Sequence, residues 1–313
     1  MNFSEKNTFL ITGGAGFIGA NLVRKLLTFG SRVIVVDNFM SGKRNNLPQN
    51  DKLIVIEQSV QEFDLNKYNE ITGVFHLAAQ ASVPVSISNF YCSSSNNNIS
   101  SLKVIDFCAK SKIPLIYASS SAVYGNIPIG IEDKDIELIH PYSVDKYMLE
   151  KYTEMAFNVY GLNSCGLRFF NVYGPYQDGS NTYSGVISIF IERLLNGKDI
   201  IINGGKQTRD FIYIDDVVDA ILLSFQYIKK NRTFDVLNVL SNTSISVDTL
   251  ANKIARLIGI TPKKKYLPLS LTDPKISVGS AAKITKELNF YPKIDIDTGL
   301  KLTISWMKEK IEK

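Results

Sequence analysis

The chain has 313 residues, of which 45% are hydrophobic and 21% charged, and its formal net charge is +5. These values are typical of a globular protein with one large or two coupled domains, and the lysines are too scattered to predict a nucleic-acid groove. No apolar run reaches the ~18 residues that a membrane span needs, and the N-terminus passes directly into a strand without a leader, so we expect no membrane partner and a cytoplasmic protein. Three cysteines and two histidines without ligand spacing lead us to expect no metal site and no histidine-based triad.

Short aliphatic runs alternate with stretches of helical spacing over the first half of the chain. The runs predict strands at residues 8–12, 32–37, 53–57, 73–78, 114–119 and 164–170, with helical spacing at 20–28 and 142–159. Unbroken Val, Ile and Leu runs that alternate with helices indicate a parallel sheet with both faces covered. The predicted fold class is therefore α/β, a doubly wound parallel sheet of Rossmann type. A Ser- and Asn-rich stretch at 92–101 is expected to lead into a helix.

The pattern changes after Gly174 and Pro175, where polar loops lengthen and apolar runs become fewer. We therefore predict an NAD-binding Rossmann domain over residues 1–172 and a smaller, mostly C-terminal α/β domain for the substrate over 173–313. Strand and helix returns to the first domain are expected from about residue 205 to 240.

Nine residues near the N-terminus, ITGGAGFIG at 11–19, contain four glycines. Gly13, Gly16 and Gly19 fit the spacing G-x-x-G-x-x-G, directly after the first predicted strand and at the start of the first helix. Asp37 follows 18 residues after Gly19, at the end of the second strand. In such a unit bare glycine backbone approaches a pyrophosphate at a helix N-terminus, and the carboxylate binds ribose hydroxyls. The sequence therefore predicts a dinucleotide site.

The acidic residue also indicates which dinucleotide binds. A carboxylate at Asp37 would repel the 2'-phosphate of NADP, which favours NAD as the cofactor. Lys43 and Arg44 lie close by in the sequence and leave NADP as the alternative.

Two tyrosine and lysine pairs in one predicted helix could provide a base. Tyr142 with Lys146, and Tyr147 with Lys151, are each four residues apart and so share a helix face. A tyrosine takes a proton from an alcohol only where a nearby cation stabilises its phenolate. Because the pairs are offset by five residues, at most one of them can address the cofactor. The serines at 119–121, at the end of a predicted parallel strand, offer hydroxyl donors and favour the first pair.

Six segments occur in an order that resembles a known superfamily. They are the glycine loop, HLAAQASV at 76–83, SSSAVYG at 119–125, PYSVDK at 141–146, LRFFNVYGP at 167–175 and TRDFIYIDDVVDA at 208–220. Together they resemble the extended short-chain dehydrogenase/reductase superfamily, and within it the nucleotide-sugar 4-epimerases of UDP-glucose/UDP-N-acetylglucosamine type, over roughly residues 7 to 305. The resemblance implies an NAD-dependent isomerase in which Tyr142 takes the proton of the sugar 4-hydroxyl and a transient 4-keto sugar turns before it is reduced on its other face.

The resemblance also implies roles for individual residues. The implied catalytic residues are Ser120, Tyr142 and Lys146. The implied cofactor contacts are Gly13, Gly16, Phe17, Ile18, Gly19, Asp37, Asn38, Ala78, Ala79, Asn97, Tyr142 and Lys146. The implied contacts with the nucleotide-sugar substrate are Ser120, Ser121, Asn171, Val186, Arg209, Lys275 and Ser277. A homodimer is implied as well, built through two helices per subunit, one of which carries Tyr142.

The guanidinium of Arg209 suits a diphosphate, and a surface ion pair with Asp215 or Asp216 is the alternative. Serine replaces the second arginine that the family uses for the diphosphate, at Ser270, with Lys275 as a weaker substitute, so the nucleotide stays open.

Two further departures from the family pattern bear on the reaction. Ser121 and Ala122 lie where members that eliminate water or carbon dioxide carry acidic residues, which argues against a dehydratase or a decarboxylase. Ser277 is small at the position that gates sugar size, which favours acceptance of UDP-GlcNAc and UDP-GalNAc as well as UDP-Glc and UDP-Gal.

Other functions are compatible with the same motifs. The first alternative is another nucleotide-sugar enzyme of this fold, either a 4-dehydrogenase that releases its keto sugar or an epimerase at another carbon or of a non-UDP sugar. The second is a non-catalytic NAD-binding protein, against which the joint presence of Ser120, Tyr142 and Lys146 argues. A place in polysaccharide biosynthesis is an expectation from the resemblance.

Overall fold

The computed structural model of the chain describes residues 3–68, 70–181, 184–270 and 272–311. The chain forms two compact units. The first contains Met1–Ser120, His140–Arg168 and Val218–Leu237, and the second Ser121–Ile139, Phe169–Val217 and Asn238–Lys313. The domain boundary placed at residue 172 from the sequence stays a prediction.

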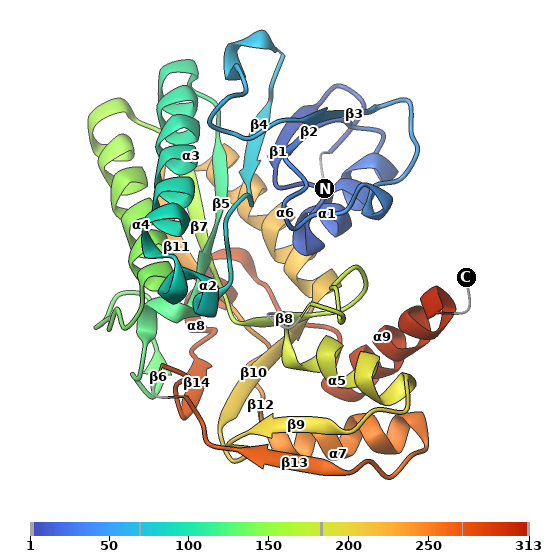
Figure 1. The fold of residues 1–313 in the computed structure, drawn as a ribbon. Helices are drawn as coiled ribbons and strands as arrows, with labels where there is room; N and C mark the ends of the chain where they lie inside the picture. Colours follow the sequence, from blue (N-terminus) through green and yellow to red (C-terminus); the bar gives the residue numbers. More distant parts are fainter. Residues whose placement is uncertain (1–2, 69, 182–183, 271, 312–313) are drawn as a thin grey trace. The chain divides into compact units, whose positions relative to one another are not determined.

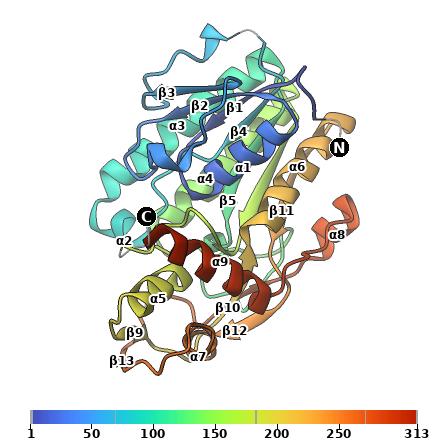
Figure 2. The ribbon, with the colours of Figure 1, turned by 90° about the vertical axis from the view of Figure 1, so that its right-hand side faces the viewer.

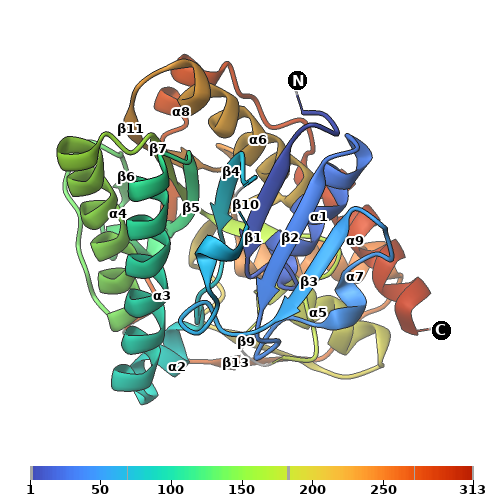
Figure 3. The same ribbon diagram turned by 90° about the horizontal axis from the view of Figure 1, so that it is seen from above.

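A seven-stranded sheet forms the centre of the first unit (Figures 1 and 3). The elements of this unit, some of which run on into the second, are β1 (Thr8–Thr12), α1 (Phe17–Thr28), β2 (Arg32–Asp37), β3 (Leu53–Glu57), β4 (Gly73–His76), α2 (Val83–Ser88), α3 (Phe90–Ser111), β5 (Leu115–Ser120), α4 (Pro141–Tyr160), β7 (Ser164–Phe169), α6 (Ile214–Lys230) and β11 (Phe234–Val239). The strand order is β11-β7-β5-β4-β1-β2-β3, and the ladders β1–β2, β2–β3, β1–β4 and β4–β5 are parallel. The predicted doubly wound α/β fold is confirmed.

The two faces of this sheet bury different side chains, because successive strand residues point to opposite sides. Val74 of β4 belongs to a core that includes Val104 of α3 and Leu149 of α4. The next strand residue, Phe75, contacts the ring of Phe225 of α6, with centroids 5.4 Å apart. Figure 2 shows α1 and α6 in front of the strands and α3 and α4 behind them. Helices therefore cover both faces, as the aliphatic runs predict.

Helix α3 differs from the expectation drawn from its sequence. The Ser- and Asn-rich stretch 92–101 lies inside the helix and not ahead of it. Ser100 and Ser101 donate their hydroxyl hydrogens to the carbonyl oxygens of Asn96 and Asn97, at 2.8 and 2.7 Å, so these polar side chains are satisfied within the helix. Packing of α3 along α4 overrides the weak helix propensity of the stretch.

The second unit is built around one central strand, β10. Its elements are β6 (Ile129–Gly130), β8 (Asn171–Tyr173), α5 (Val186–Leu195), β9 (Ile200–Asn203), β10 (Thr208–Tyr213), β12 (Ser244–Ser246), α7 (Val247–Ile258), β13 (Lys264–Leu267), β14 (Ile276–Gly279), α8 (Ala282–Leu288) and α9 (Ile296–Ile311). Strand β10 pairs with β8 and β14 in parallel and with β12 antiparallel, while β9 and β13 form a separate parallel pair. Helices α5, α7 and α9 pack on one another. In the described ranges, no helix has the length and apolar character that crossing a membrane requires.

Candidate active site

Ser120, Tyr142 and Lys146 meet in the first unit. Ser120 is the last residue of β5, and the other two lie in the first two turns of α4. The side chains of Ser120 and Tyr142 are hydrogen-bonded to each other. The ammonium nitrogen of Lys146 lies 5.7 Å from the centroid of the Tyr142 ring and donates to the carbonyl oxygen of Ala118 at 2.7 Å. A hydroxyl, a phenol and a cation thus come together at the carboxyl end of a parallel strand, where open α/β sheets place their sites.

The alternative pair, Tyr147 and Lys151, has different surroundings on the same helix. Lys151 is largely exposed, lies over the Tyr147 ring and forms an ion pair with Glu154 at 2.8 Å. The serine that distinguishes the two pairs, Ser120, bonds to Tyr142.

The structure also separates the three serines at 119–121. Ser119 is buried, and its hydroxyl donates to the carboxylate of Glu150. Ser120 meets Tyr142. Ser121 begins the 3-10 turn Ser121–Tyr124 and belongs to the second unit.

Burial dominates the electrostatics of the phenol and the amine. It raises the pKa of Tyr142 to about 12, an effect that the hydrogen bond with Ser120 opposes and Asp145 reinforces. It lowers the pKa of Lys146 to about 8, against Asp145 and Glu150, which favour the charged ammonium. A phenolate at Tyr142 therefore depends on positive charge held close to its ring.

His140 fixes the start of the helix that carries Tyr142. Its Nδ1 accepts a hydrogen bond from the backbone N–H of Ser143 at 3.1 Å, and the Ser143 hydroxyl oxygen accepts from the backbone N–H of His140 at 3.3 Å. This reciprocal capping box satisfies two backbone donors at the helix end. Burial lowers the pKa of His140, which favours the neutral ring that such a cap requires.

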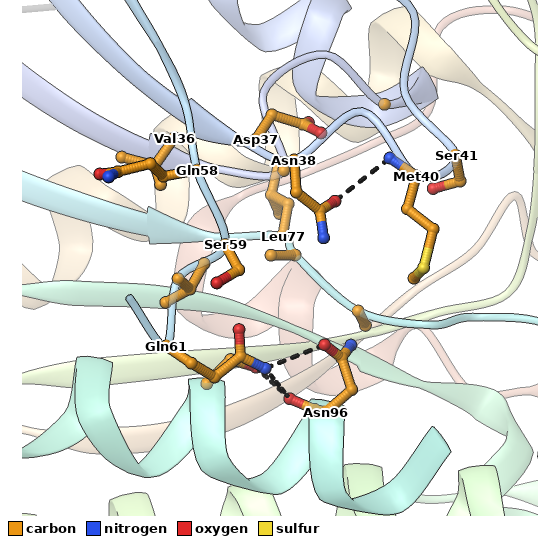
Figure 4. Close-up of a pocket in the computed structure, with 16 residues that line it drawn as sticks. Val36, Asp37, Asn38, Met40, Ser41, Gln58, Ser59, Gln61, Leu77 and Asn96 are labelled. Atoms are coloured by element: carbon orange, nitrogen blue, oxygen red, sulfur yellow. Dashed lines mark hydrogen bonds between the residues drawn. The ribbon is translucent and has the colours of Figure 1, made fainter. Parts of the chain in front are cut away.

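A pocket lies beside the glycine loop (Figure 4), and together with the open solvent at its mouth it has a volume of about 550 Å³. Six of the predicted cofactor residues line it, namely Gly13, Gly16, Asp37, Asn38, Ala78 and Ala79. Figure 4 shows two amide side chains held in its wall: Asn38 accepts from the backbone N–H of Met40 at 3.2 Å, and Gln61 donates to Asn96 Oδ1 at 2.9 Å. The sequence prediction did not include Met40, Gln61 or Asn96 among the pocket residues.

Two glycines of the loop, Gly13 and Gly19, leave no room for a side chain. Gly13 has a φ of 72°, and a Cβ on it would lie 2.7 Å from the backbone nitrogen of Ala78. A Cβ on Gly19 would clash with the carbonyl oxygen of Gly13. Helix α1 begins directly after Gly16, so Phe17, Ile18 and Gly19 form its first turn. Bare backbone ahead of a helix N-terminus fits a pyrophosphate.

Asp37 is buried at the end of β2 and held by the backbone around it. Its Oδ2 accepts from the N–H of Ala15 and its Oδ1 from the N–H of Phe39, each at 2.9 Å. The guanidinium of Arg44 lies over the Phe39 ring, 5.9 Å from the centroid. A fixed carboxylate beside a pocket lined by the glycine loop fits the adenosine ribose of NAD, so the residues present fit this cofactor.

The sequence predicts a cofactor contact for Asn97, and the structure places its amide in contacts within the protein. Its Oδ1 accepts from the N–H of Gln80 at 2.7 Å, and its Nδ2 donates to the Gln80 carbonyl at 3.1 Å and to Asp145 Oδ2 at 2.9 Å. Asn97 thereby ties the loop that contains Ala78 and Ala79 to α4. Its direct contact with the cofactor stays a prediction.

Four of the predicted substrate residues of the second unit lie on β8, α5, β10 and β14, while Ser121 lies in a 3-10 turn and Lys275 directly precedes β14. Asn171 begins β8 and donates to the carbonyl of Asp210 at 2.9 Å, and Val186 begins α5. Arg209 of β10 lies directly opposite Ser277 of β14 in their parallel ladder.

The surroundings of Arg209 differ from the alternative considered from the sequence. Arg209 is buried, forms an ion pair with Asp273, and donates from Nη1 to the carbonyl of Thr208 at 2.8 Å. Lys275, the possible substitute for the missing arginine, is exposed, and the hydroxyl of Ser270 is hydrogen-bonded with that of Thr272. The roles of these residues toward a substrate stay predictions.

A buried ion pair next to the predicted catalytic residues was not predicted from the sequence. Glu150 on α4 and Arg168 on β7 are joined at 2.7 Å. The available signal was spacing, because Glu150 continues the four-residue interval of Tyr142 and Lys146 along the helix. Among the described residues, no group of three or more His, Cys, Asp or Glu is arranged to hold a metal ion.

A family model, related proteins and solved structures all place the chain in one family. The model of the NAD dependent epimerase/dehydratase family matches residues 9–239. The UDP-N-acetylglucosamine 4-epimerase of Methanobrevibacter ruminantium M1, solved in complex with UDP-N-acetylmuramic acid, is 34% identical, with a TM-score of 0.91 over 97% of this chain and 99% of that one. The UDP-glucose 4-epimerase of Thermus thermophilus, solved in complex with NAD, is 30% identical, with a TM-score of 0.86 over 96% and 99%.

Relatives with a different reaction are found at similar identity. A UDP-N-acetyl-alpha-D-glucosaminuronate decarboxylase of Bacillus cytotoxicus is 31% identical over 97% of this chain and 98% of the relative. The family model confirms the prediction of NAD as the cofactor and that of an enzyme of the NAD-dependent epimerase kind. The chain belongs to the NAD-dependent epimerase/dehydratase family.

Proposed function

We propose that the protein is a UDP-hexose 4-epimerase that interconverts UDP-GlcNAc with UDP-GalNAc, UDP-Glc with UDP-Gal, or both, and that it uses Tyr142 as its base. The observation that carries the proposal is the meeting of Ser120, Tyr142 and Lys146 at the end of β5. Similar proteins named as UDP-sugar 4-epimerases support the reaction class. Such a product would supply precursors for polysaccharide biosynthesis.

The proposed mechanism gives each side chain one step. NAD, when bound, supplies the acceptor for the two electrons that leave C4 of the sugar. Tyr142 as phenolate takes the proton of the 4-hydroxyl, and Ser120 hydrogen-bonds to the same reacting oxygen. Lys146 holds the phenolate through its charge, which offsets the burial that raises the pKa of Tyr142. The 4-keto sugar then turns, and Tyr142 returns its proton to O4 once C4 is reduced on the other face.

A decarboxylase is the second candidate, because a relative at 31% identity bears that name. An acid beside the serine and tyrosine assists the loss of carbon dioxide or water. Ser121 and Ala122 fill the positions where an acid is expected, and the nearby carboxylates of Asp145 and Glu150 are bonded to Asn97 and Arg168. A 4-dehydrogenase that releases its keto sugar is distinguished by its product.

We also propose that two copies of the chain pair through α3 and α4. These helices lie side by side (Figure 1). They expose large apolar side chains to solvent, including Ile99 at 54% of its surface and Val159 at 64%. Burial of such side chains against a second copy stabilises a dimer.

The test of the proposed reaction is incubation of purified protein with UDP-GlcNAc and, separately, with UDP-Glc, without added NAD, followed by proton NMR of the anomeric and H4 signals. Appearance of the galacto epimer in either tube is the expected result and ranks the two sugars. Accumulation of a keto sugar with one equivalent of NADH contradicts the proposal in favour of a dehydrogenase. A third incubation with a UDP-hexuronate, which carries the carboxylate that a decarboxylase removes, tests the second candidate, and release of a UDP-pentose there contradicts the proposal in favour of a decarboxylase.

A further inference from the structure

Glu150 lies one turn after Lys146 and two turns after Tyr142, on the same face of α4. It is buried, and its Oε1 accepts a hydrogen bond from the hydroxyl of Ser119 on β5. Residues 118–120 of β5 are thus bound, one each, to three successive turns of α4. These three bonds fix how far the end of the strand lies along the helix.

Arg168 holds Glu150 in place from the neighbouring strand, β7. Its Nε donates to Oε1 at 2.9 Å and its Nη2 to Oε2 at 2.7 Å, a two-pronged contact that fixes the plane of the carboxylate. Each of the two side chains exposes 4% of its surface. Burying both charges has a high desolvation cost, and such pairs are often no more stabilising than apolar residues of the same volume. A contribution to the stability of the fold is therefore a weak explanation for the presence of this buried ion pair.

We propose that Glu150 and Arg168 are positioning residues for the catalytic centre, because their ion pair anchors Ser119 and thereby sets the adjacent Ser120 against Tyr142. The inference rests on the proposed function for its kinetic consequences but not for its structural ones. The ion pair thereby fixes the register between β5 and α4. The contact between the Ser120 hydroxyl and the Tyr142 phenol depends on this register.

The pair has an electrostatic consequence for Lys146 as well. The charged and titratable groups around this ammonium are Tyr142, Asp145 and Glu150 on its own helix and His76 on β4. Burial lowers the pKa of His76 to about 3, so its ring is neutral. Burial lowers the pKa of Lys146, and Glu150 together with Asp145 opposes this shift. The carboxylate of Glu150 therefore helps to keep Lys146 charged beside the phenol.

Glu150→Gln tests both effects, because the amide keeps the shape and an acceptor oxygen but removes the charge. In the NAD-loaded variant we expect Tyr142 to titrate at higher pH than in the wild type, measured as the absorbance difference against the same protein with Tyr142→Phe. We expect kcat to fall roughly tenfold to a hundredfold with little change in KM. The pH range in which the enzyme is active should narrow, because Lys146 loses its proton at lower pH and activity on the alkaline side therefore declines at lower pH.

Glu154→Gln is the matched control. Glu154 lies one turn further along α4 and pairs with Lys151 at the surface, so its variant should keep the wild-type titration, kcat and pH range. If Glu150→Gln is merely less stable, with the titration of Tyr142 and the pH range unchanged, the pair is structural and the inference is wrong.

A second variant is needed if Glu150→Gln does not fold because it leaves the charge of Arg168 unpaired. Glu150→Gln combined with Arg168→Met removes both charges, so no unpaired charge is left buried, which is the main cost of removing one partner of a buried pair. The shifted titration of Tyr142 should persist in this double variant, and a wild-type titration would overturn the inference. The titration of Tyr142 needs no substrate, so it tests the positioning role separately from the reaction. If the wild-type protein is inactive but Tyr142 titrates at higher pH in the Glu150 variant, the proposed function is refuted and the positioning role stands.

Discussion

Tyr142 and Tyr147 each precede a lysine by four residues, and their different neighbours provide a matched test of the catalytic assignment. Tyr142 meets Ser120, whereas the lysine that accompanies Tyr147 is paired with Glu154 at the surface. Tyr142→Phe removes the proton acceptor and keeps the ring, so we expect kcat to fall roughly a hundredfold to ten-thousandfold. The measurements are epimer formation by NMR and the amount of NAD that copurifies, which should not change. Tyr147→Phe should retain activity, and similar losses in both variants would contradict the assignment.

Ser277 allows a test of sugar size at a single position. It lies opposite Arg209 in the β10–β14 ladder, so a larger side chain there occupies space next to the proposed diphosphate contact. We expect Ser277→Tyr to lower the ratio of kcat/KM for UDP-GlcNAc to that for UDP-Glc by at least roughly tenfold, because the acetamido group needs the space. Steady-state kinetics on the two substrates measures the ratio. Ser277→Ala should leave it unchanged, and an unchanged ratio in the tyrosine variant would remove Ser277 from the sugar site.

At the scale of elements, the sequence predicts the first unit better than the second. Residues 32–37 form β2 as predicted, since an unbroken aliphatic run buried on both faces has little alternative to a central parallel strand. Strands of the second unit such as β12 and β14 are three and four residues long and pair with distant β10, so no local periodicity marks them.

The same contrast holds within the candidate site. The spacing of Tyr142 and Lys146 is local to one helix and could be predicted. The bonds of Asn97 to Gln80 and of Glu150 to Arg168 join different elements, so spacing along the sequence can place Glu150 on the face of Tyr142 and Lys146 but cannot identify these bonding partners.

The end of β4 gives the first unit a predicted sensitivity to acid. His76 is buried there, with Nδ1 2.7 Å from the hydroxyl of Thr12 on β1 and Nε2 3.1 Å from that of Ser101 on α3. Burial, with a smaller contribution from Lys146, lowers its pKa from 6.5 to about 3. Below about pH 6.5 the His76 ring therefore binds a proton in the unfolded chain but stays neutral in the folded one. The free energy of unfolding consequently falls as the pH decreases, by roughly 3 kcal/mol at about pH 4.

Urea unfolding at a series of pH values measures this slope. His76→Asn removes the titrating ring and keeps hydrogen-bonding groups, so the difference between wild type and variant isolates the contribution of His76 from that of protonated carboxylates. His140→Asn, which changes the other histidine of the chain to another good helix cap, is the control and should preserve most of the slope. A wild-type slope in the His76 variant would show that this ring does not control acid stability.

At the scale of the whole molecule, the exposed apolar side chains of α3 and α4 predict the oligomeric state. Met155 and Val159 lie one turn apart on α4 and expose 40% and 64% of their surfaces. Neighbouring exposed apolar side chains mark interaction sites on soluble proteins more often than scattered ones do. We therefore expect a dimer at micromolar concentration and, in Met155→Glu with Val159→Lys, a monomer, because charges in an apolar interface lose their hydration.

Sedimentation velocity measures the mass of both proteins, and circular dichroism checks that the variant keeps its helices. Leu302→Lys is the matched control: Leu302 is an apolar residue on α9 that exposes 45% of its surface, and its replacement should leave a dimer intact. Because Tyr142 and Lys146 lie on the same helix as the replaced residues, the activity of the monomer is informative too. Full activity in a folded monomer would show that each chain holds a complete catalytic centre, whereas a wild-type protein that sediments as a monomer would refute the proposed pairing of α3 and α4.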